Sequence, residues 1–521
     1  MGVNDYYNIV KPQLNKLVKF NILDSLYVIR QYVLYSFNGY KLNEPDFRYI
    51  ENSQRCKIPV YLADFLIANI IKYGSVVTTN TTLRDYKSRK DIISYWHNIY
   101  EECNRIAMEP NALIWLKSYV FTQYKMQHFE HIFYKLYKYY FLYKSNKVVN
   151  YIDEKMGLNI HRYFVAILFL YFYFTKTYST EISKIYETMS YGDKYWSYKE
   201  IKTILDMVSI DLKTIKYRIK PNYDYRLIFN FYNNSLHVQK PIIVDKDNLY
   251  CPVPIYILNA AIEGLSYYVD LRSSTDEYKE FAENFENYIG EQLQYYKNIG
   301  HSFNLSKEVI YKKNLKSSDW IIWDHCNIIF IDCKLKKMSI GGIQEITIKD
   351  NDIETLIDDG YLSSNRKRED IKKTLSPGLV KDIMELGVDL GKIFKCYLDY
   401  KNKDIMSLPY LSELKFRAII LTLEECYCNI YHIKQKILKV ANEYVKVKTK
   451  QECIFKESDF LILSSADFDM NVPNLGFNNI DNFWSKLINP LQEKDIIENS
   501  YLSNKFDDLF NSVEKEFLNY S

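Results

Sequence analysis

The segment that most constrains this chain is residues 318–334, which has the pattern of a β-hairpin. Two runs rich in Ile, Phe and Trp flank a short polar turn, as expected for two antiparallel strands. A loop of two or of four residues gives the same register, with Trp323 opposite Ile328. Counting outward along the strands places Asp319 opposite Asp332. Directly opposed side chains have Cβ atoms roughly 5 Å apart, and like charges in such a pair destabilise the sheet.

A divalent cation between these two carboxylates would turn their repulsion into ligation, because hard cations bind carboxylate oxygens. Without the cation, replacing Asp332 with alanine would relieve the repulsion. Lys334 lies two residues beyond Asp332 and therefore projects from the same face of the strand. Two carboxylates and an ammonium group on one face suit phosphodiester hydrolysis.

An acidic residue two positions before a lysine is common in this composition, as at Asp85 and Lys87 or at Glu413 and Lys415. Most such pairs fall on helical or loop patterns, where they are solvated surface. Only the pair ending at Lys334 closes a buried strand whose hairpin partner supplies another aspartate.

These residues resemble the motif of the PD-(D/E)XK nuclease superfamily, with Asp319 as the first acid, Asp332 as the second and Lys334 as the lysine. Ser318 stands in place of the motif's proline, and aspartate rather than glutamate fills the second acidic position; both are common variations. The resemblance covers about residues 275–470 and implies an α/β fold with an αβββαβ core.

The resemblance also implies a cofactor, Mg²⁺ or Mn²⁺, ligated by Asp319 and Asp332, with the Cys333 carbonyl as a further ligand. It implies double-stranded DNA as the default substrate, although RNA stays open. Stand-alone bacterial proteins of this kind with a long helical extension often serve in antiviral defence against phage.

A fourth site residue is expected on the helix predicted at 276–297, which precedes the sheet. Its apolar residues fall on one arc at about 100° per residue: Phe281, Phe285, Tyr288, Ile289, Leu293 and Tyr296. Glu286 lies just beyond the edge of this arc, and Glu283 and Glu291 lie further round. Glu286 is therefore the candidate to bind the metal directly or through water. The alternative is that it is one more surface acid on an acid-rich helix.

The remaining core elements alternate between strands and a helix, which favours an α/β sheet. The predicted strands are 306–313, 416–426 and 460–464, and the predicted amphipathic helix is 381–400. The acidic pair Asp467 and Asp469 follows the last strand. It lacks a matching lysine or histidine, so we interpret it as a turn. His325 lies at the hairpin tip, away from the carboxylates.

A chain of 521 residues is too long to fold around a single hydrophobic core, so two or three domains are expected. We divide it into four parts. Residues 1–220 form a mainly helical domain, and residues 221–272 form a connector with short strands at 225–236 and 241–250 and a helix. Residues 273–470 form a nuclease-like domain, and residues 471–521 form a helical tail. Target recognition, autoinhibition and docking of a protein partner all stay open for residues 1–220.

Five segments of the first half show apolar residues at helical spacing: 11–40, 64–73, 91–108, 112–149 and 161–178. The longest apolar run, 163–174, is too short to span a bilayer and predicts a buried helix. No membrane association is expected.

The net charge is only +3, so any attraction for nucleic acid must be local. Lys336 and Lys337 directly follow the motif, and Arg366, Lys367 and Arg368 form a second basic group. These five residues are the candidates for contacting phosphates. The second group could equally be a solvated loop.

The nine cysteines are scattered and contain no Cys-x-x-Cys pair, which predicts reduced thiols and a cytoplasmic location. The first residues are polar and acidic, so no signal peptide is expected. The sequence as a whole predicts a metal-dependent nuclease. The alternative is a catalytically silent scaffold or sensor that keeps the fold and binds nucleic acid or a partner protein.

Overall fold

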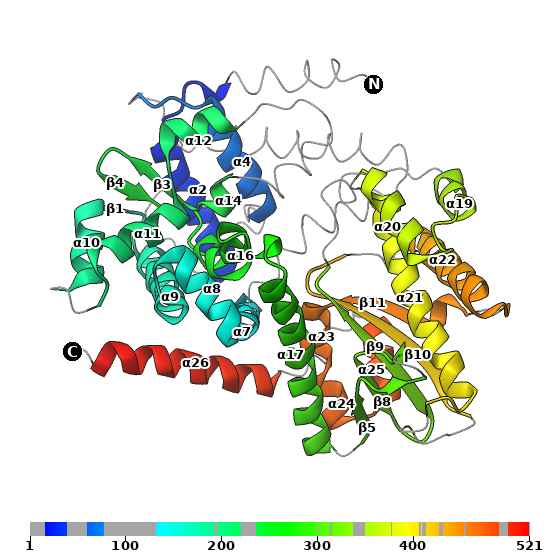
Figure 1. Cartoon of the computed structure of the whole chain (residues 1–521). Helices are drawn as coiled ribbons and strands as arrows, with labels where there is room; N and C mark the ends of the chain where they lie inside the picture. The colour runs from blue at the N-terminus through cyan, green and yellow to red at the C-terminus, as the bar shows by residue number, and fades with distance from the viewer. Residues whose placement is uncertain are drawn as a thin grey trace. The chain divides into compact units, whose positions relative to one another are not determined.

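The structure is a computed structural model, and it shows a mixed α/β protein made of two compact units (Figure 1). Unit 1 comprises the described residues up to Tyr278 and those from Leu509 onward, and unit 2 comprises those from Lys279 to Asp508. The described residues are 16–38, 60–77, 132–191, 195–219, 236–300, 302–312, 315–336, 350–376, 378–405, 408, 413–426, 431–452, 455–488 and 499–519.

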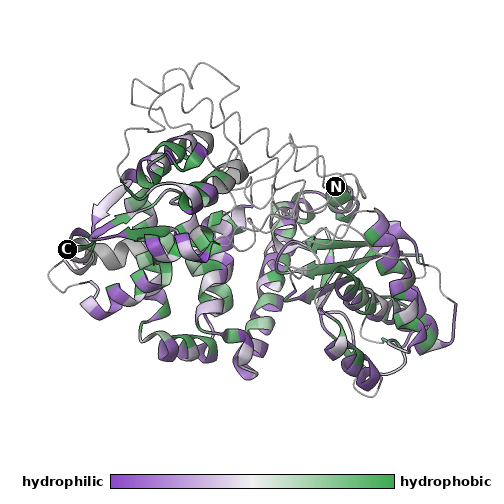
Figure 2. Ribbon diagram, turned by 90° about the horizontal axis from the view of Figure 1, so that it is seen from above, coloured by the Kyte–Doolittle hydropathy of each residue, from purple (hydrophilic) through white to green (hydrophobic). Residues whose placement is uncertain are grey.

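Unit 2 is built on a five-stranded mixed sheet with the order β11-β10-β9-β8-β5. The central strand β9 is parallel to β10 and antiparallel to β8, β10 is also parallel to β11, and β8 is also antiparallel to β5. The strands are β5 (Asn304–Lys307), β8 (Trp320–Trp323), β9 (Asn327–Lys334), β10 (Lys415–Thr422) and β11 (Phe460–Ser464). Figure 2 shows apolar residues concentrated in these strands.

The hairpin of β8 and β9 has the register that the sequence predicts. Trp323 lies opposite Ile328, and Ile321 lies opposite Phe330. The Asp324 carboxylate closes the turn by accepting hydrogen bonds from the backbone N–H groups of Cys326 and Asn327, at 2.8 and 2.7 Å. This local bond is the kind by which aspartate favours turns.

Helices cover both faces of this sheet. On one face the ring of Phe330 contacts the rings of Tyr397 and Tyr400 of α21 (Leu379–Lys401), with centroids 6.2 and 6.3 Å apart. On the other face Trp320 packs against α17 (Asp276–Gly300). Because side chains alternate along a strand, α17 and α21 contact opposite faces of the β8–β9 hairpin.

Gly290 lets α17 approach the sheet closely. A Cβ atom at this position would lie 2.0 Å from Cζ2 of Trp320, and the indole Nε1–H of Trp320 donates to the Glu286 carbonyl at 3.0 Å. We expect Gly290→Ala to destabilise the protein by about 2 kcal/mol, because overpacking a core forces side chains and backbone to shift. Thermal unfolding measures this change. Glu283→Ala, an exposed position on the same helix, is the control, and equal melting temperatures for both variants would refute the tight contact.

The other described helices of unit 2 surround the sheet or extend its edges, with α22 packed along α21. They are α19 (Asp350–Asp358), α20 (Asn365–Thr374), α22 (Tyr431–Thr449), α23 (Ser465–Asn471), α24 (Pro473–Phe477), α25 (Ile480–Ile488) and the start of α26 (Ser500–Asn519).

Two predictions about the end of the chain are wrong. Asp467 and Asp469 lie in helix α23 rather than in a turn, because the Ser464 side chain caps the helix and Asp467 completes a capping box. The predicted tail at 471–521 is not a separate element, since its described residues up to Asp508 belong to unit 2. Asn499, for example, accepts a hydrogen bond from Tyr296 of α17 at 2.8 Å.

Unit 1 is mainly helical, as predicted, and also contains a four-stranded sheet with the order β1-β4-β3-β2. Its strands are β1 (Ser179–Glu181), β2 (Ser209–Asp211), β3 (Ile242–Asp245) and β4 (Asn248–Tyr250). Its main described helices are α2 (Ile22–Asn38), α4 (Val60–Tyr73), α7 (Ile132–Tyr143), α8 (Asn146–Met156), α9 (Ile160–Lys176), α10 (Ile182–Ser190), α11 (Tyr198–Val208) and α12 (Leu212–Arg218).

The predicted boundaries of the first half need correction. The predicted boundary near 272 lies close to the end of the first part of unit 1 at Tyr278, but the one near 220 falls inside that unit. The strand predicted at 225–236 and the helix predicted at 91–108 lie outside the described residues. The strand predicted at 241–250 is the hairpin of β3 and β4.

The apolar run 163–174 forms most of α9, whose side chains are largely buried. In the described part of the chain, no single helix has both the length and the apolar composition needed to cross a membrane. Among the described helices, only α8 and α9 taken together have that length and composition, and this pair is bent by 66°.

Candidate active site

The carboxylate of Asp319 lies against strand β9, at the position that the hairpin register predicts. The β8–β9 ladder ends at Trp320 and Ile331, one residue before the two aspartates. Beyond it, the Asp319 carboxylate accepts a hydrogen bond of 2.6 Å from the backbone N–H of Cys333. Cys333 is flanked by Asp332 and Lys334, so Asp319 is held beside both.

Lys334 and Asp332 form an ion pair on the same strand, with Nζ and Oδ2 2.5 Å apart. The two residues are separated by one position, so both side chains project from one face of β9. Their side chains keep 29% and 12% exposure, respectively. Water therefore still reaches the lysine, and the pair is only partly shielded from solvent.

Glu286 is the acid of α17 that belongs to this cluster. Burial raises the pKa of Glu286, the Lys334 ammonium opposes that rise, and the charges of Glu308 and Asp332 add to it. The other acids of α17 face elsewhere. Glu283 pairs with Lys279 at 3.9 Å, and Glu291 accepts a hydrogen bond from Tyr501 at 2.7 Å.

Glu286 enters the site from the face of the sheet that α17 covers, whereas Asp332 points to the other face. Phe330 and Asp332 point to the α21 face of the sheet, whereas Trp320 contacts α17 on the other face. The hydrogen bond from the Trp320 indole to the Glu286 carbonyl fixes this turn of α17 beside the end of β8. Glu286 thus joins the cluster from the opposite side of the hairpin.

The neighbouring acids affect the pKa of Asp319. Burial, with the charges of Asp332 and Glu286 adding to it, raises the pKa of Asp319 to about 8, against the opposing effects of Lys334 and the Cys333 N–H. Burial alone would lower the pKa of Lys334. The carboxylates of Asp332, Asp389 and Asp319 outweigh burial, so the pKa of Lys334 is raised and the lysine stays charged.

Helix α21 contributes acids that sequence analysis did not single out. Asp382, Glu385 and Asp389 lie at spacings of three and four residues, and therefore on one side of the helix. Glu385 binds Lys336 at 2.8 Å, and Asp389 is one of the charges that raise the pKa of Lys334. The spacing of these three acids on one side of an amphipathic helix is visible in the sequence and could have identified them.

The predicted nucleic-acid-binding residues fall into different environments. Lys336 is engaged by Glu385 and largely buried, and Lys337 lies outside the described residues. Arg366 and Lys367 are exposed, but they lie on helix α20 rather than on a loop. Arg368 is 6% exposed and so is not available to a phosphate. Its guanidinium lies over the rings of Tyr361 and Tyr444, at 5.9 and 5.7 Å from their centroids.

The donor set suits a hard divalent cation in its chemistry, because it consists of carboxylate oxygens from Glu286, Asp319 and Asp332. For Cys333, the group seen in the cluster is its N–H rather than the carbonyl predicted as a ligand. Among the described residues, no three His, Cys, Asp or Glu side chains are close enough to enclose an ion as they stand. His325 is at the hairpin turn, at the far end from the aspartates.

Comparisons of the chain with protein-family models, with curated proteins and with solved structures give no match. What the protein does is therefore inferred from the site itself.

Proposed function

We propose that the protein is a metal-dependent nuclease that hydrolyses phosphodiester bonds, with duplex DNA as its substrate. The observation that carries the proposal is the cluster of three acids and one lysine at the end of the β8–β9 hairpin: Glu286, Asp319, Asp332 and Lys334. A structural hairpin gains nothing from a buried Asp319 whose pKa is raised further by the charges of Asp332 and Glu286.

The order of elements in unit 2 also supports the proposal. Helix α17 is followed by β5, β8 and β9 in the main sheet, then by α21 and β10. This is the αβββαβ order that the PD-(D/E)XK resemblance implies. Asp332 and Lys334 lie on the third strand of that order, Asp319 directly precedes the second, and Glu286 lies on the first helix.

Asp319, Asp332 and Glu286 would hold Mg²⁺ or Mn²⁺. Bound there, the ion would lower the pKa of a water molecule and neutralise charge on the scissile phosphate. Lys334 would orient the attacking water or stabilise the negative charge of the transition state. Because the Lys334 ammonium lies 2.5 Å from Oδ2 of Asp332, the ion and the ammonium would compete for this carboxylate.

A second candidate function is a silent scaffold or sensor with the same fold. Two observations favour it: Asp332 is neutralised by Lys334, and Asp319 is bonded to the Cys333 N–H. Both acids thus have partners without any metal. A protein of this kind would bind nucleic acid or a partner protein and would not cleave.

Incubation with nucleic acids separates the two functions. We expect the purified protein to cleave plasmid or linear duplex DNA in Mg²⁺ or Mn²⁺ and to be inactive in EDTA, with single strands and RNA as comparison substrates. Titration of Mn²⁺ into the same protein by calorimetry should show binding that Asp332→Ala loses. Cleavage that persists in EDTA would contradict the metal-dependent mechanism. Absence of both cleavage and metal binding would favour the scaffold.

A further inference from the structure

Six elements of unit 1 follow one another in the order of a winged helix-turn-helix. They are α9, β1, α10, α11, β3 and β4. Strand β1 pairs antiparallel with β4, and β3 pairs antiparallel with β4 across a tight turn. Strand β2, α12 and α14 (Leu236–Gln239) lie between α11 and β3 in the chain, and β2 extends the sheet beside β3.

Helices α10 and α11 are the two helices of the helix-turn-helix. They pack against each other, and their connection at 191–197 is longer than the three or four residues common in this motif. The described part of the connection is fixed in place. The N–H groups of Tyr195 and Trp196 donate to the carbonyls of Ser190 and Met189, both at 3.3 Å. Trp196 is buried, and its indole N–H donates to the Arg162 carbonyl at 3.3 Å.

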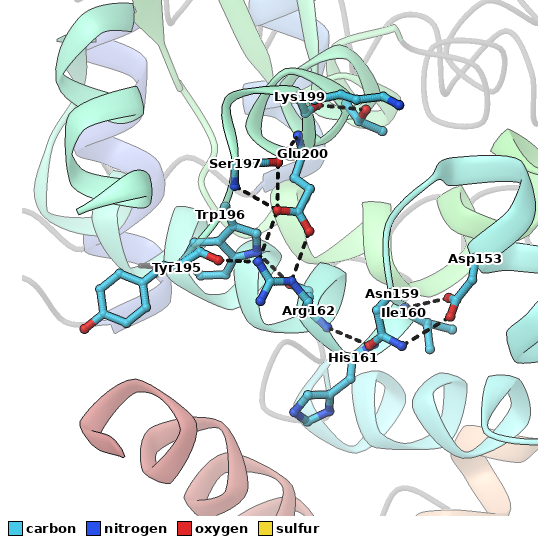
Figure 3. Close-up of polar contacts among 11 residues, drawn as sticks. Asp153, Asn159, Ile160, His161, Arg162, Tyr195, Trp196, Ser197, Lys199 and Glu200 are labelled. Carbon is cyan, nitrogen blue, oxygen red and sulfur yellow. Dashed lines mark hydrogen bonds and ion pairs between the residues drawn. The ribbon is translucent and has the colours of Figure 1, made fainter. Parts of the chain in front are cut away.

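The start of α11 is anchored to α9 by an ion pair. Figure 3 shows Arg162 of α9 reaching Glu200 in the first turn of α11. The guanidinium Nε and a terminal nitrogen lie 3.0 and 3.1 Å from the two Glu200 oxygens, and the guanidinium also donates to the Tyr195 carbonyl. Glu200 closes a capping box with Ser197 at the same time. These bonds fix the orientation of the helix that the motif uses for recognition.

Helix α11 has one buried face and one exposed face. Ile201, Ile204 and Val208 are fully buried. The side chains of Tyr198, Lys199, Lys202 and Asp206 are exposed, and at 100° per residue they fall on one arc of about 100°. Tyr198 is 68% exposed, and its ring stacks on Tyr186 of α10 with centroids 4.3 Å apart.

We infer that α11 is a recognition helix and that this face binds duplex DNA. The second helix of a helix-turn-helix enters the major groove and presents the residues of its N-terminal part, which here include Tyr198, Lys199 and Lys202. The exposed Lys246, at the β3–β4 turn, is placed to contact the backbone as the wing. Asp206 does not cancel this charge by itself, because the Lys240 ammonium lies near it and donates to its carbonyl at 2.6 Å.

Charge and groove geometry select DNA as the occupant. The four exposed residues of this face are two lysines, one aspartate and one tyrosine, and none is aliphatic, whereas a protein-docking face needs an apolar centre. The major groove of B-form DNA admits an α-helix, whereas the deep, narrow major groove of A-form RNA does not. Target recognition is therefore the role assigned to this module. This module belongs to unit 1, whereas the acidic cluster belongs to unit 2, and the inference does not depend on cleavage there.

Binding of the full-length protein to a fluorescein-labelled 30-base-pair duplex in EDTA tests the inference by anisotropy. We expect Lys199→Ala with Lys202→Ala to weaken binding by about tenfold or more at low salt. The slope of log affinity against log salt should fall by about 2, because two phosphate contacts are lost. Lys147→Ala with Lys155→Ala, two exposed lysines of α8, is the control with the same change of charge.

Arginine at positions 199 and 202 should restore binding, since arginine also contacts phosphates. This rescue separates loss of charge from loss of folding. Equal binding by the Lys199/Lys202 and control variants would overturn the inference, whether or not the protein cleaves DNA. Failure of the wild type to bind the duplex at low salt would also overturn it and would assign the face to a protein partner. If the wild type binds the duplex, the Lys199/Lys202 alanine variant loses binding, and neither protein cleaves DNA, the recognition-helix inference stands and the proposed nuclease function is rejected.

Discussion

Replacing Lys334 with alanine should lower metal-dependent cleavage by at least about 100-fold, because the transition state loses a preorganised positive charge. The ion pair adds a second expectation. Lys334 holds Asp332 at 2.5 Å, so its removal frees that carboxylate, and Mn²⁺ should bind the variant at least as tightly as the wild type. Single-turnover cleavage and calorimetry measure the two effects separately.

Lys279→Ala is the matched control, since Lys279 is an exposed lysine of α17 that pairs with Glu283 at 3.9 Å, away from the cluster. Asp332→Ala should instead lose both cleavage and metal binding. Cleavage at the wild-type rate by both the Lys334 and the Asp332 variants would remove this cluster from consideration as the active site.

Replacing Asp319 with asparagine should change how stability depends on pH. Burial and the neighbouring acids raise the pKa of Asp319 from 3.8 to about 8, so between these values the folded protein holds a proton that the unfolded chain releases. The contribution of this proton to the free energy of unfolding is fully present below about pH 4 and is lost as the pH rises through about 8. Asp319→Asn removes this dependence and keeps an oxygen that accepts from the Cys333 N–H.

We therefore expect the variant to be more stable than the wild type at pH 8, by on the order of a few kcal/mol, and the difference to disappear near pH 4. Urea unfolding between these pH values in EDTA measures it. Asp352→Asn, at an exposed position on α19, should run parallel to the wild type. If the free energy of unfolding of Asp319→Asn also ran parallel to that of the wild type across this pH range, the pKa of Asp319 would not be raised in the folded protein. Mg²⁺ should stabilise the wild type at pH 8 more than the variant.

The hairpin could be predicted because its information is local. Alternation of apolar residues and a polar turn specify the register, and the register brings Asp319 beside Asp332. Glu286 could be predicted because it borders the apolar arc of a long helix. The two aspartates are not the uncompensated repulsive pair that the hairpin pattern predicts. Lys334 neutralises Asp332, so Asp332→Ala should lower stability rather than raise it.

Features set by distant parts of the chain could not be predicted. Arg368 belongs to a basic run in the sequence, but Tyr361 and Tyr444 enclose it in the fold. Asp469 resembled a turn residue because no lysine or histidine was near it. Its partners are Tyr288 and Gln292 of α17, whose side chains donate to it at 3.0 and 2.9 Å. Three-residue strands such as β1 and β2 are too short to show a period.

The mixed sheet has a consequence for the order of folding. Asp319, Asp332 and Lys334 are joined by a tight hairpin, whereas β9 and β10 meet only after the chain has closed a loop of about 80 residues. Closing the longer loop costs roughly 3 kcal/mol more in chain entropy than closing the hairpin. We therefore expect the hairpin to form before β10 pairs with β9, and to bring Lys334 together with the two aspartates as their counterion. The charges of Glu286 and Asp389 are added only when the helices dock.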